Sequence, residues 1–101
     1  MTPVRLTLLT LVTRAGCHLC EEMAAVIEAV AGEFPVRLET RNVDEDEGLR
    51  NRYAHEVPVL LINGRKAFKY RVTVVELRRR LRAEQRRFGH GAWRRLFDAA
   101  R

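Results

Sequence analysis

Two cysteines that lie three positions apart are the residues in this chain with the clearest chemical potential. Cys17 and Cys20 are its only cysteines, and they enclose His18 and Leu19. Two cysteines do not make a disulfide scaffold, and a loop this short gains little stability from closure. In such a protein a Cys-X-X-Cys pair indicates thiol–disulfide exchange or metal binding.

The sequence around the pair predicts that Cys17 stands between a strand and a helix. Residues 5–13 are apolar and rich in β-branched side chains, as in a buried strand. From His18 onward, apolar side chains recur with helical spacing up to a stop at Gly32. A thiol at a helix N-terminus faces unpaired N–H groups and the positive end of the helix dipole, which favour the thiolate. We therefore expect Cys17 to be the nucleophile and Cys20 to resolve a mixed disulfide.

Arg14 and His18 flank the two cysteines and carry the nearest basic groups in the sequence. Either side chain can support a thiolate through its charge, His18 only when it is protonated. We treat Arg14 as a candidate substrate-binding residue, with an exposed turn residue as the equal alternative. For His18, exposure in the turn is the preferred interpretation.

A second strand, a short helix and a third strand are predicted after the first helix. Apolar and charged side chains alternate over residues 35–43, as in a half-buried strand. Asp44 can cap a short helix that runs to about Tyr53. The apolar residues 57–62 indicate a third strand, opened by Pro58 where the missing N–H is not needed.

The remaining elements complete an α/β fold. Asn63-Gly64 is a strong hairpin signal, which makes residues 65–71 a fourth strand antiparallel to the third. Thr73 can cap a last, long helix. A right-handed crossover makes the first two strands parallel. The predicted order is β-α-β-α-β-β-α, with a four-stranded mixed sheet and a short C-terminal helical extension.

The last third of the chain is strongly basic. Nine arginines and three acidic residues follow Arg71, and the formal net charge of the chain is +6. We expect Gly89 and Gly91 to end the long helix, which divides the chain into a domain (residues 1–88) and a basic amphipathic extension (residues 89–101). A basic helix can attract nucleic acid or an acidic protein. Because the arginines occupy the exposed helical positions without interleaved aromatic residues, we expect a solvated face and no nucleic-acid partner.

With these elements assigned, the chain resembles a glutaredoxin-like member of the thioredoxin superfamily over about residues 5–88. The resemblance rests on Cys17-His18-Leu19-Cys20 after the first strand, Val57-Pro58 at the third strand and Asn63-Gly64 in the hairpin. It implies a thioredoxin-like fold, thiol–disulfide exchange and no tightly bound cofactor. It also implies a cis peptide bond before Pro58, which would present the backbone of Val57 to an extended substrate.

The sequence differs from familiar glutaredoxins at two places that bear on the binding of glutathione. His18-Leu19 stands where those proteins have Pro-Tyr or a similar pair, and residues 70–73 replace a Gly-Gly pair followed by an acid. The close backbone approach that glycine permits is therefore missing. Arg71 and the helix N-terminus near Thr73 can still hold a carboxylate, with a plain surface role as the equal alternative for Arg71. The predicted substrate is a disulfide-containing protein or a glutathione mixed disulfide, with glutathione as a candidate co-substrate.

Two alternatives remain beside the oxidoreductase. A zinc site usually takes four ligands, and this motif supplies two, so zinc or an iron–sulfur cluster would need a second subunit or glutathione. We predict no metal. The other alternative is a redox-regulated adaptor or binding module of thioredoxin fold, which would exchange disulfides slowly but bind a partner differently once oxidised.

Composition and hydropathy indicate one soluble domain. The chain has 101 residues, of which 47% are hydrophobic and 32% charged, values that argue against disorder. No apolar run is long enough to span a bilayer, and the apolar stretch near the N-terminus is too short and too interrupted for a signal peptide. We predict a cytoplasmic monomer without membrane contact. Trp93 and Phe97 are expected to pack back on the domain, with a partner or a membrane surface as the alternative.

Overall fold

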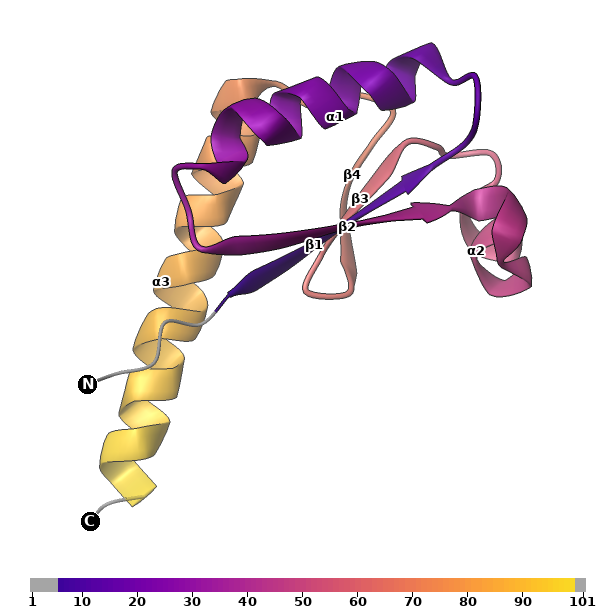
Figure 1. Cartoon of the computed structure of the whole chain (residues 1–101). Helices are drawn as coiled ribbons and strands as arrows, with labels where there is room; N and C mark the ends of the chain where they lie inside the picture. The colour runs from indigo at the N-terminus through magenta and orange to yellow at the C-terminus, as the bar shows by residue number, and fades with distance from the viewer. Residues whose placement is uncertain (1–5, 100–101) are drawn as a thin grey trace.

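The computed structural model describes the backbone of residues 6–99 and the side chains of residues 6–87. Strands and helices follow in the order β-α-β-α-β-β-α, with a 3-10 turn inserted before the second helix (Figure 1). This is the predicted order. The elements are β1 (Thr7–Thr13), α1 (His18–Ala31), β2 (Val36–Asn42), η1 (Val43–Glu45), α2 (Glu47–Tyr53), β3 (Val59–Ile62), β4 (Arg65–Lys69) and α3 (Val74–Ala99).

The four strands form one mixed sheet in the spatial order β2-β1-β3-β4. β1 runs parallel to β2 and antiparallel to β3, which pairs in turn with β4. The turn between β3 and β4 is Asn63-Gly64, with φ of 50° and 82°, as a type I′ hairpin requires. The predicted parallel pair and the predicted hairpin are both confirmed.

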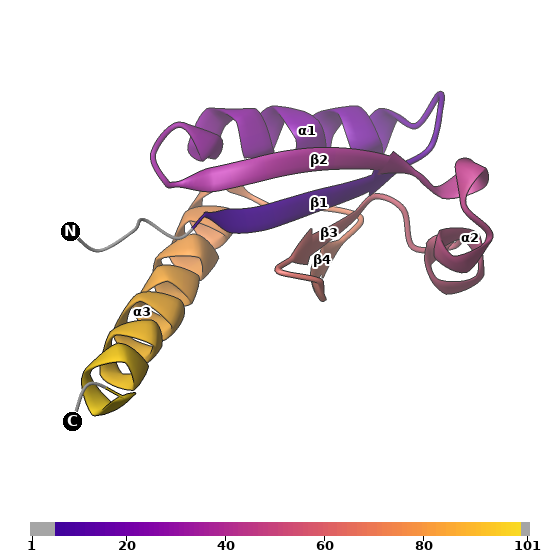
Figure 2. The same ribbon diagram turned by 60° about the horizontal axis from the view of Figure 1, so that its bottom comes forward.

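Helices pack against both faces of the sheet. Figure 2 shows α1 lying along the sheet and α2 near the end of β2. Leu9 and Leu11 of β1 belong to the larger core cluster, together with Ile27 of α1 and Leu77 of α3. Val12 belongs to the smaller cluster, which packs against α2. Since successive side chains of a strand point to opposite faces, β1 is buried on both sides, which explains its continuous apolar run.

β2 is an edge strand, and its burial differs from the predicted alternation. Val36 packs against the core, but Leu38 is 41% exposed. Glu39, predicted to face solvent, is partly covered and accepts a hydrogen bond from the Thr10 hydroxyl at 2.9 Å. An edge strand has a neighbouring strand on one side only, so an apolar side chain in it is not necessarily buried.

The acidic run after β2 caps α2 through a different residue from the predicted one. Asp46 is the N-cap, and its side chain accepts a hydrogen bond from the Leu49 N–H at 2.9 Å. Asp44 lies earlier, in η1, where its carboxylate binds Arg14. Both acids are good capping residues, and the 3-10 turn moves the start of the helix by two positions.

The predicted break in the last helix is wrong, because α3 continues through Gly89 and Gly91 to Ala99. A glycine inside a helix costs about 1 kcal/mol relative to alanine, which a long helix tolerates. The division at residue 88 therefore falls within α3 and stays a prediction, and the Trp93 and Phe97 side chains lie outside the described part. Within residues 6–99, no helix combines the length and apolar character needed to cross a membrane.

Candidate functional site

Cys17 and Cys20 form a disulfide at the start of α1, with their Cα atoms 5.2 Å apart. Cys17 is the N-cap of the helix, and its Sγ accepts a hydrogen bond from the Cys20 N–H at 3.1 Å. Cys20 lies within the first turn and is 4% exposed, whereas Cys17 is only partly covered. Solvent therefore reaches Cys17 more easily than Cys20.

The turn before Cys17 determines how the helix begins. Gly16 has φ of 71°, in the left-handed region that favours glycine, and the next residue returns to an extended backbone (φ −95°, ψ 108°). An N-cap is usually Ser, Thr, Asp or Asn, whose oxygen accepts a hydrogen bond from the first helical turn. Here sulfur takes that position, so the N–H group that would stabilise a Cys17 thiolate already points at it.

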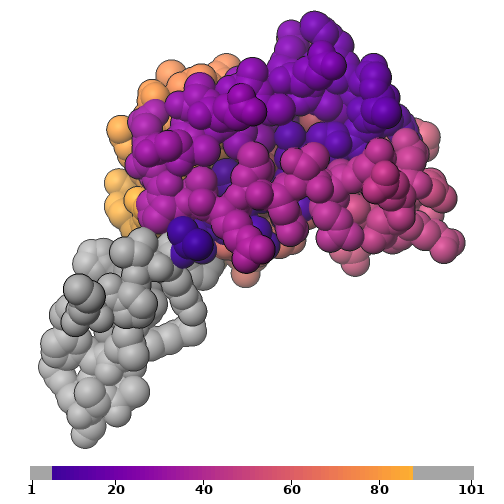
Figure 3. All heavy atoms as spheres, viewed as in Figure 1, coloured from indigo at the N-terminus to yellow at the C-terminus, as the bar shows by residue number. Residues whose placement is uncertain are grey.

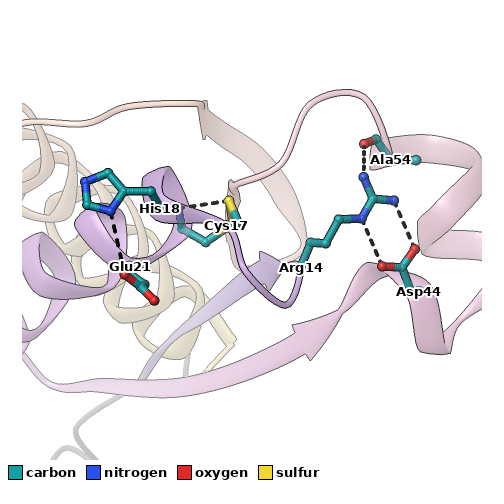
Figure 4. Close-up of a disulfide and its surroundings, with 7 residues drawn as sticks. Arg14, Cys17, His18, Glu21, Asp44 and Ala54 are labelled. Atoms are coloured by element: carbon teal, nitrogen blue, oxygen red, sulfur yellow. Dashed lines mark hydrogen bonds and ion pairs between the residues drawn. A yellow bond between two sulfur atoms is a disulfide. The ribbon is translucent and has the colours of Figure 1, made fainter.

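Arg14 extends from the turn before Cys17 toward α2 (Figure 4). Its Nε and Nη2 donate to the two carboxylate oxygens of Asp44, each at 2.9 Å, and its Nη1 donates to the Ala54 carbonyl at 3.1 Å. The hydrogen bonds with Asp44 raise the pKa of Arg14 and lower the pKa of Asp44. Arg14 thus ties the Cys17 turn to the end of α2, and its role in substrate binding stays a prediction.

The peptide bond between Val57 and Pro58 is cis, as predicted. The segment after β4 holds this loop, since the Tyr70 N–H donates to the Pro58 carbonyl at 2.8 Å. The Tyr70 hydroxyl donates to the His55 carbonyl at 2.9 Å. Sequence reasoning overlooked Tyr70, whose backbone adopts a positive φ of 67° that its residue type does not indicate.

Arg71 and Thr73 follow Tyr70 at the start of α3. The Arg71 side chain is exposed. The Thr73 hydroxyl accepts from the Glu76 N–H at 3.0 Å, and the Glu76 carboxylate accepts from the Thr73 N–H at 3.1 Å. This reciprocal capping box places a carboxylate of the chain itself where an incoming carboxylate was predicted. The Thr-X-X-Glu spacing signalled it in the sequence.

A pocket of about 300 Å³ lies beside the disulfide, between α1 and the C-terminal ends of β1 and β2. Of the predicted site residues, Arg14, Cys17 and Cys20 line this pocket. The other four do not line it: Val57, Pro58, Arg71 and Thr73. Figure 3 shows indigo atoms from early in the chain between those of α1 and β2. The lining residues are Leu11, Thr13, Arg14, Ala15, Gly16, Cys17, Cys20, Glu21, Ala24 and Thr40.

His18 points into solvent, with 82% of its side chain exposed, as preferred from the sequence. Its two ring nitrogens lie 3.7 Å from the carboxylates of Glu21 and Glu22, an attraction that operates only when the ring is protonated. In the described part of the chain, no three His, Cys, Asp or Glu side chains gather as a metal-binding group would require.

Comparison with known proteins identifies the family and agrees with this fold. Residues 8–82 match the model of the glutaredoxin-like domain (DUF836). The chain belongs to this family. Protein Ne2328 from Nitrosomonas europaea is similar in structure, with 30% identity and a TM-score of 0.68, over 80% of this chain and 98% of that one. Target protein XcR50 from X. campestris has 29% identity and a TM-score of 0.64, over 74% and 96%.

A more distant likeness establishes the fold. A mutant thioredoxin from Halobacterium salinarum has 20% identity and a TM-score of 0.58, over 76% of this chain and 73% of that one. At this identity the likeness concerns architecture alone. The predicted thioredoxin-like fold is thus confirmed, and the family model confirms the predicted resemblance to glutaredoxin-like proteins.

Proposed function

We propose that this glutaredoxin-like protein is a thiol–disulfide oxidoreductase in which Cys17 attacks the substrate and Cys20 resolves the intermediate. The observation that carries the proposal is the difference between the two cysteines. Cys17 is partly exposed and caps a helix, whereas Cys20 is 4% exposed and lies close enough to bond to it. A nucleophile must meet its substrate, and a resolving thiol must meet only the nucleophile.

The proposed reaction transfers two electrons from the reduced protein to a substrate disulfide. The Cys17 thiolate attacks one substrate sulfur and forms a mixed disulfide, and the other substrate sulfur leaves as a thiolate that takes a proton from water. Cys20 then gives its proton to water, and its thiolate attacks Cys17 Sγ. This step forms the Cys17–Cys20 disulfide and releases the second substrate sulfur as a thiolate, which takes a proton from water. Two molecules of an external thiol, for which glutathione is the candidate, must return the two electrons and leave as their own disulfide.

The substrate we propose is a protein disulfide or a glutathione mixed disulfide. As the family resemblance implies, the backbone of Val57 is the proposed partner for an extended substrate chain. A glutathione carboxylate would have to share the N-terminus of α3 with Glu76, which already binds the Thr73 N–H, or pair with the exposed Arg71. This arrangement favours a protein substrate. A cytoplasmic location and a monomeric state stay predictions.

The test compares reduced wild-type protein with Cys17→Ser and Cys20→Ser, with bis(2-hydroxyethyl) disulfide and a glutathionylated peptide as substrates. We expect Cys17→Ser to lose exchange with both. Cys20→Ser should lose dithiol turnover and accumulate a mixed disulfide at Cys17, which mass spectrometry detects. Retained activity in Cys17→Ser, with loss in Cys20→Ser, would reverse the assignment. Wild-type turnover no higher than that of Cys17→Ser would favour the redox-regulated adaptor.

A further inference from the structure

The pocket beside the disulfide lies on the opposite side of Cys17 from the cis-proline loop. In the sheet order β2-β1-β3-β4, the pocket is bounded by β1 and by Thr40 of β2, while Pro58 precedes β3 on the other side of β1. A substrate chain that follows the cis-proline loop therefore has the pocket beyond the reacting sulfur. A side chain next to the substrate cysteine can reach it.

The pocket combines an apolar floor with one carboxylate. Leu11 and Ala24 supply apolar surface from the sheet and from α1, and Thr13 supplies a hydroxyl. Arg14 also lines the pocket, but its charge is paired with Asp44. Glu21 is thus the lining residue that leaves a net charge in the pocket, and its side chain is 76% exposed.

The size of the pocket fits a side chain. Pockets for whole small molecules range from roughly 300 to 1,000 Å³, and this one, at about 300 Å³, is at the lower limit. An aliphatic stem can lie on Leu11 and Ala24 while a terminal cation remains near water. Lysine and arginine bind in this way, with the stem on apolar surface and the charge in solvent.

We propose that this pocket binds a lysine or arginine side chain next to the reacting cysteine of a protein substrate, with Glu21 as the partner of the cation. The proposal rests on the function proposed above and specifies its substrate. It makes the pocket a specificity site in which Glu21 contacts the substrate and takes no part in electron transfer.

The first test uses peptides that differ only in the two residues X that flank a central cysteine, which are lysine, leucine or aspartate. In each peptide the cysteine forms a mixed disulfide with 2-mercaptoethanol. The reduced full chain reacts with each, and alkylation followed by mass spectrometry gives the rate constants. We expect Glu21→Gln to lower the lysine-to-aspartate rate ratio about two- to fivefold, the range of an exposed ion pair.

Glu22→Gln is the matched control for charge. Glu22 lies 3.7 Å from His18, as Glu21 does, but does not line the pocket. Each substitution removes one negative charge from the same helical turn, so long-range effects of net charge are equal. We expect Glu22→Gln to keep the wild-type ratio. An equal fall in both variants, or no fall in Glu21→Gln, would overturn the proposal.

A second test fills the pocket. Ala24→Leu places a larger side chain in it, and Ala25→Leu places the same side chain on the exposed neighbouring position. We expect Ala24→Leu alone to slow the lysine peptide relative to an X = glycine peptide. Unchanged relative rates in Ala24→Leu would show that no side chain enters the pocket. If wild-type protein reduces neither the peptides nor bis(2-hydroxyethyl) disulfide, the proposed function itself fails.

Discussion

Gly16 and Gly32 stand at the two ends of α1, and replacing each with alanine should change stability in opposite directions. Gly16 has φ of 71°, while Gly32 has φ of −68° and ψ of −14°, an ordinary helical conformation. A Cβ atom added at either position would meet nothing within 4 Å. The comparison therefore isolates the backbone conformation from steric clashes.

The expected change in the free energy of unfolding follows from two opposing effects. Alanine in the left-handed conformation costs about 1–2 kcal/mol. Replacing glycine also restricts the unfolded chain, which stabilises the folded state by about 0.4–1 kcal/mol where the backbone suits alanine. Gly32→Ala should therefore gain about 0.4–1 kcal/mol, and Gly16→Ala should lose up to about 1.5 kcal/mol. The unfolded-state term is common to both, so the variants should differ by about 1–2 kcal/mol.

Urea unfolding of both oxidised variants, followed by circular dichroism, measures this difference. Gly16→Asn serves as a further control, because asparagine tolerates the left-handed region and should fall between glycine and alanine. Equal stability of Gly16→Ala and Gly32→Ala would refute the reasoning. It would mean that the turn before Cys17 can adopt another conformation without cost.

Two further predictions concern the ion pair and the core. Because Arg14 holds the pKa of Asp44 below its usual 3.8, the unfolded chain binds the proton more readily, and the stabilisation present above pH 3.8 is lost as the pH falls through the folded-state pKa. In thermal melts between neutral and acid pH, the Tm of Asp44→Asn should change less with pH than the Tm of wild type. Parallel curves of Tm against pH would contradict this. Leu77→Ala removes a fully buried side chain and should cost about 2–5 kcal/mol, while Val75→Ala, at a 59% exposed position, should stay within about 0.5 kcal/mol in urea unfolding.

Local signals were sufficient to predict most of the fold. Asn63-Gly64 specifies its hairpin because a type I′ turn needs a positive φ at both positions. The pair Cys17 and Cys20 follows a strand and opens a helix, and chain order alone places it at the end of β1. The cis bond before Pro58 came from the family resemblance, because the residues around it carry no local signal for a cis isomer.

Contacts between distant parts of the chain were not predictable in the same way. Asp44 looked like a helix cap because its neighbours are acidic and polar, but its partner Arg14 lies 30 positions away. The pocket has a similar origin, since Thr40 joins it only through the pairing of β2 with β1. Burial on an edge strand depends on which helices reach it, as the exposed Leu38 illustrates.

The engagement of Arg14 also decides which groups can stabilise a Cys17 thiolate in the proposed reaction. Its guanidinium makes three hydrogen bonds to Asp44 and Ala54, so the positive charge is already paired. Figure 4 shows the side chain directed away from Cys17. His18 is exposed and faces Glu21 and Glu22. The remaining group that can stabilise the thiolate is the start of α1, where the Cys20 N–H contacts Cys17 Sγ at 3.1 Å. In this protein the helix N-terminus, more than a basic side chain, is therefore the group placed to favour the thiolate.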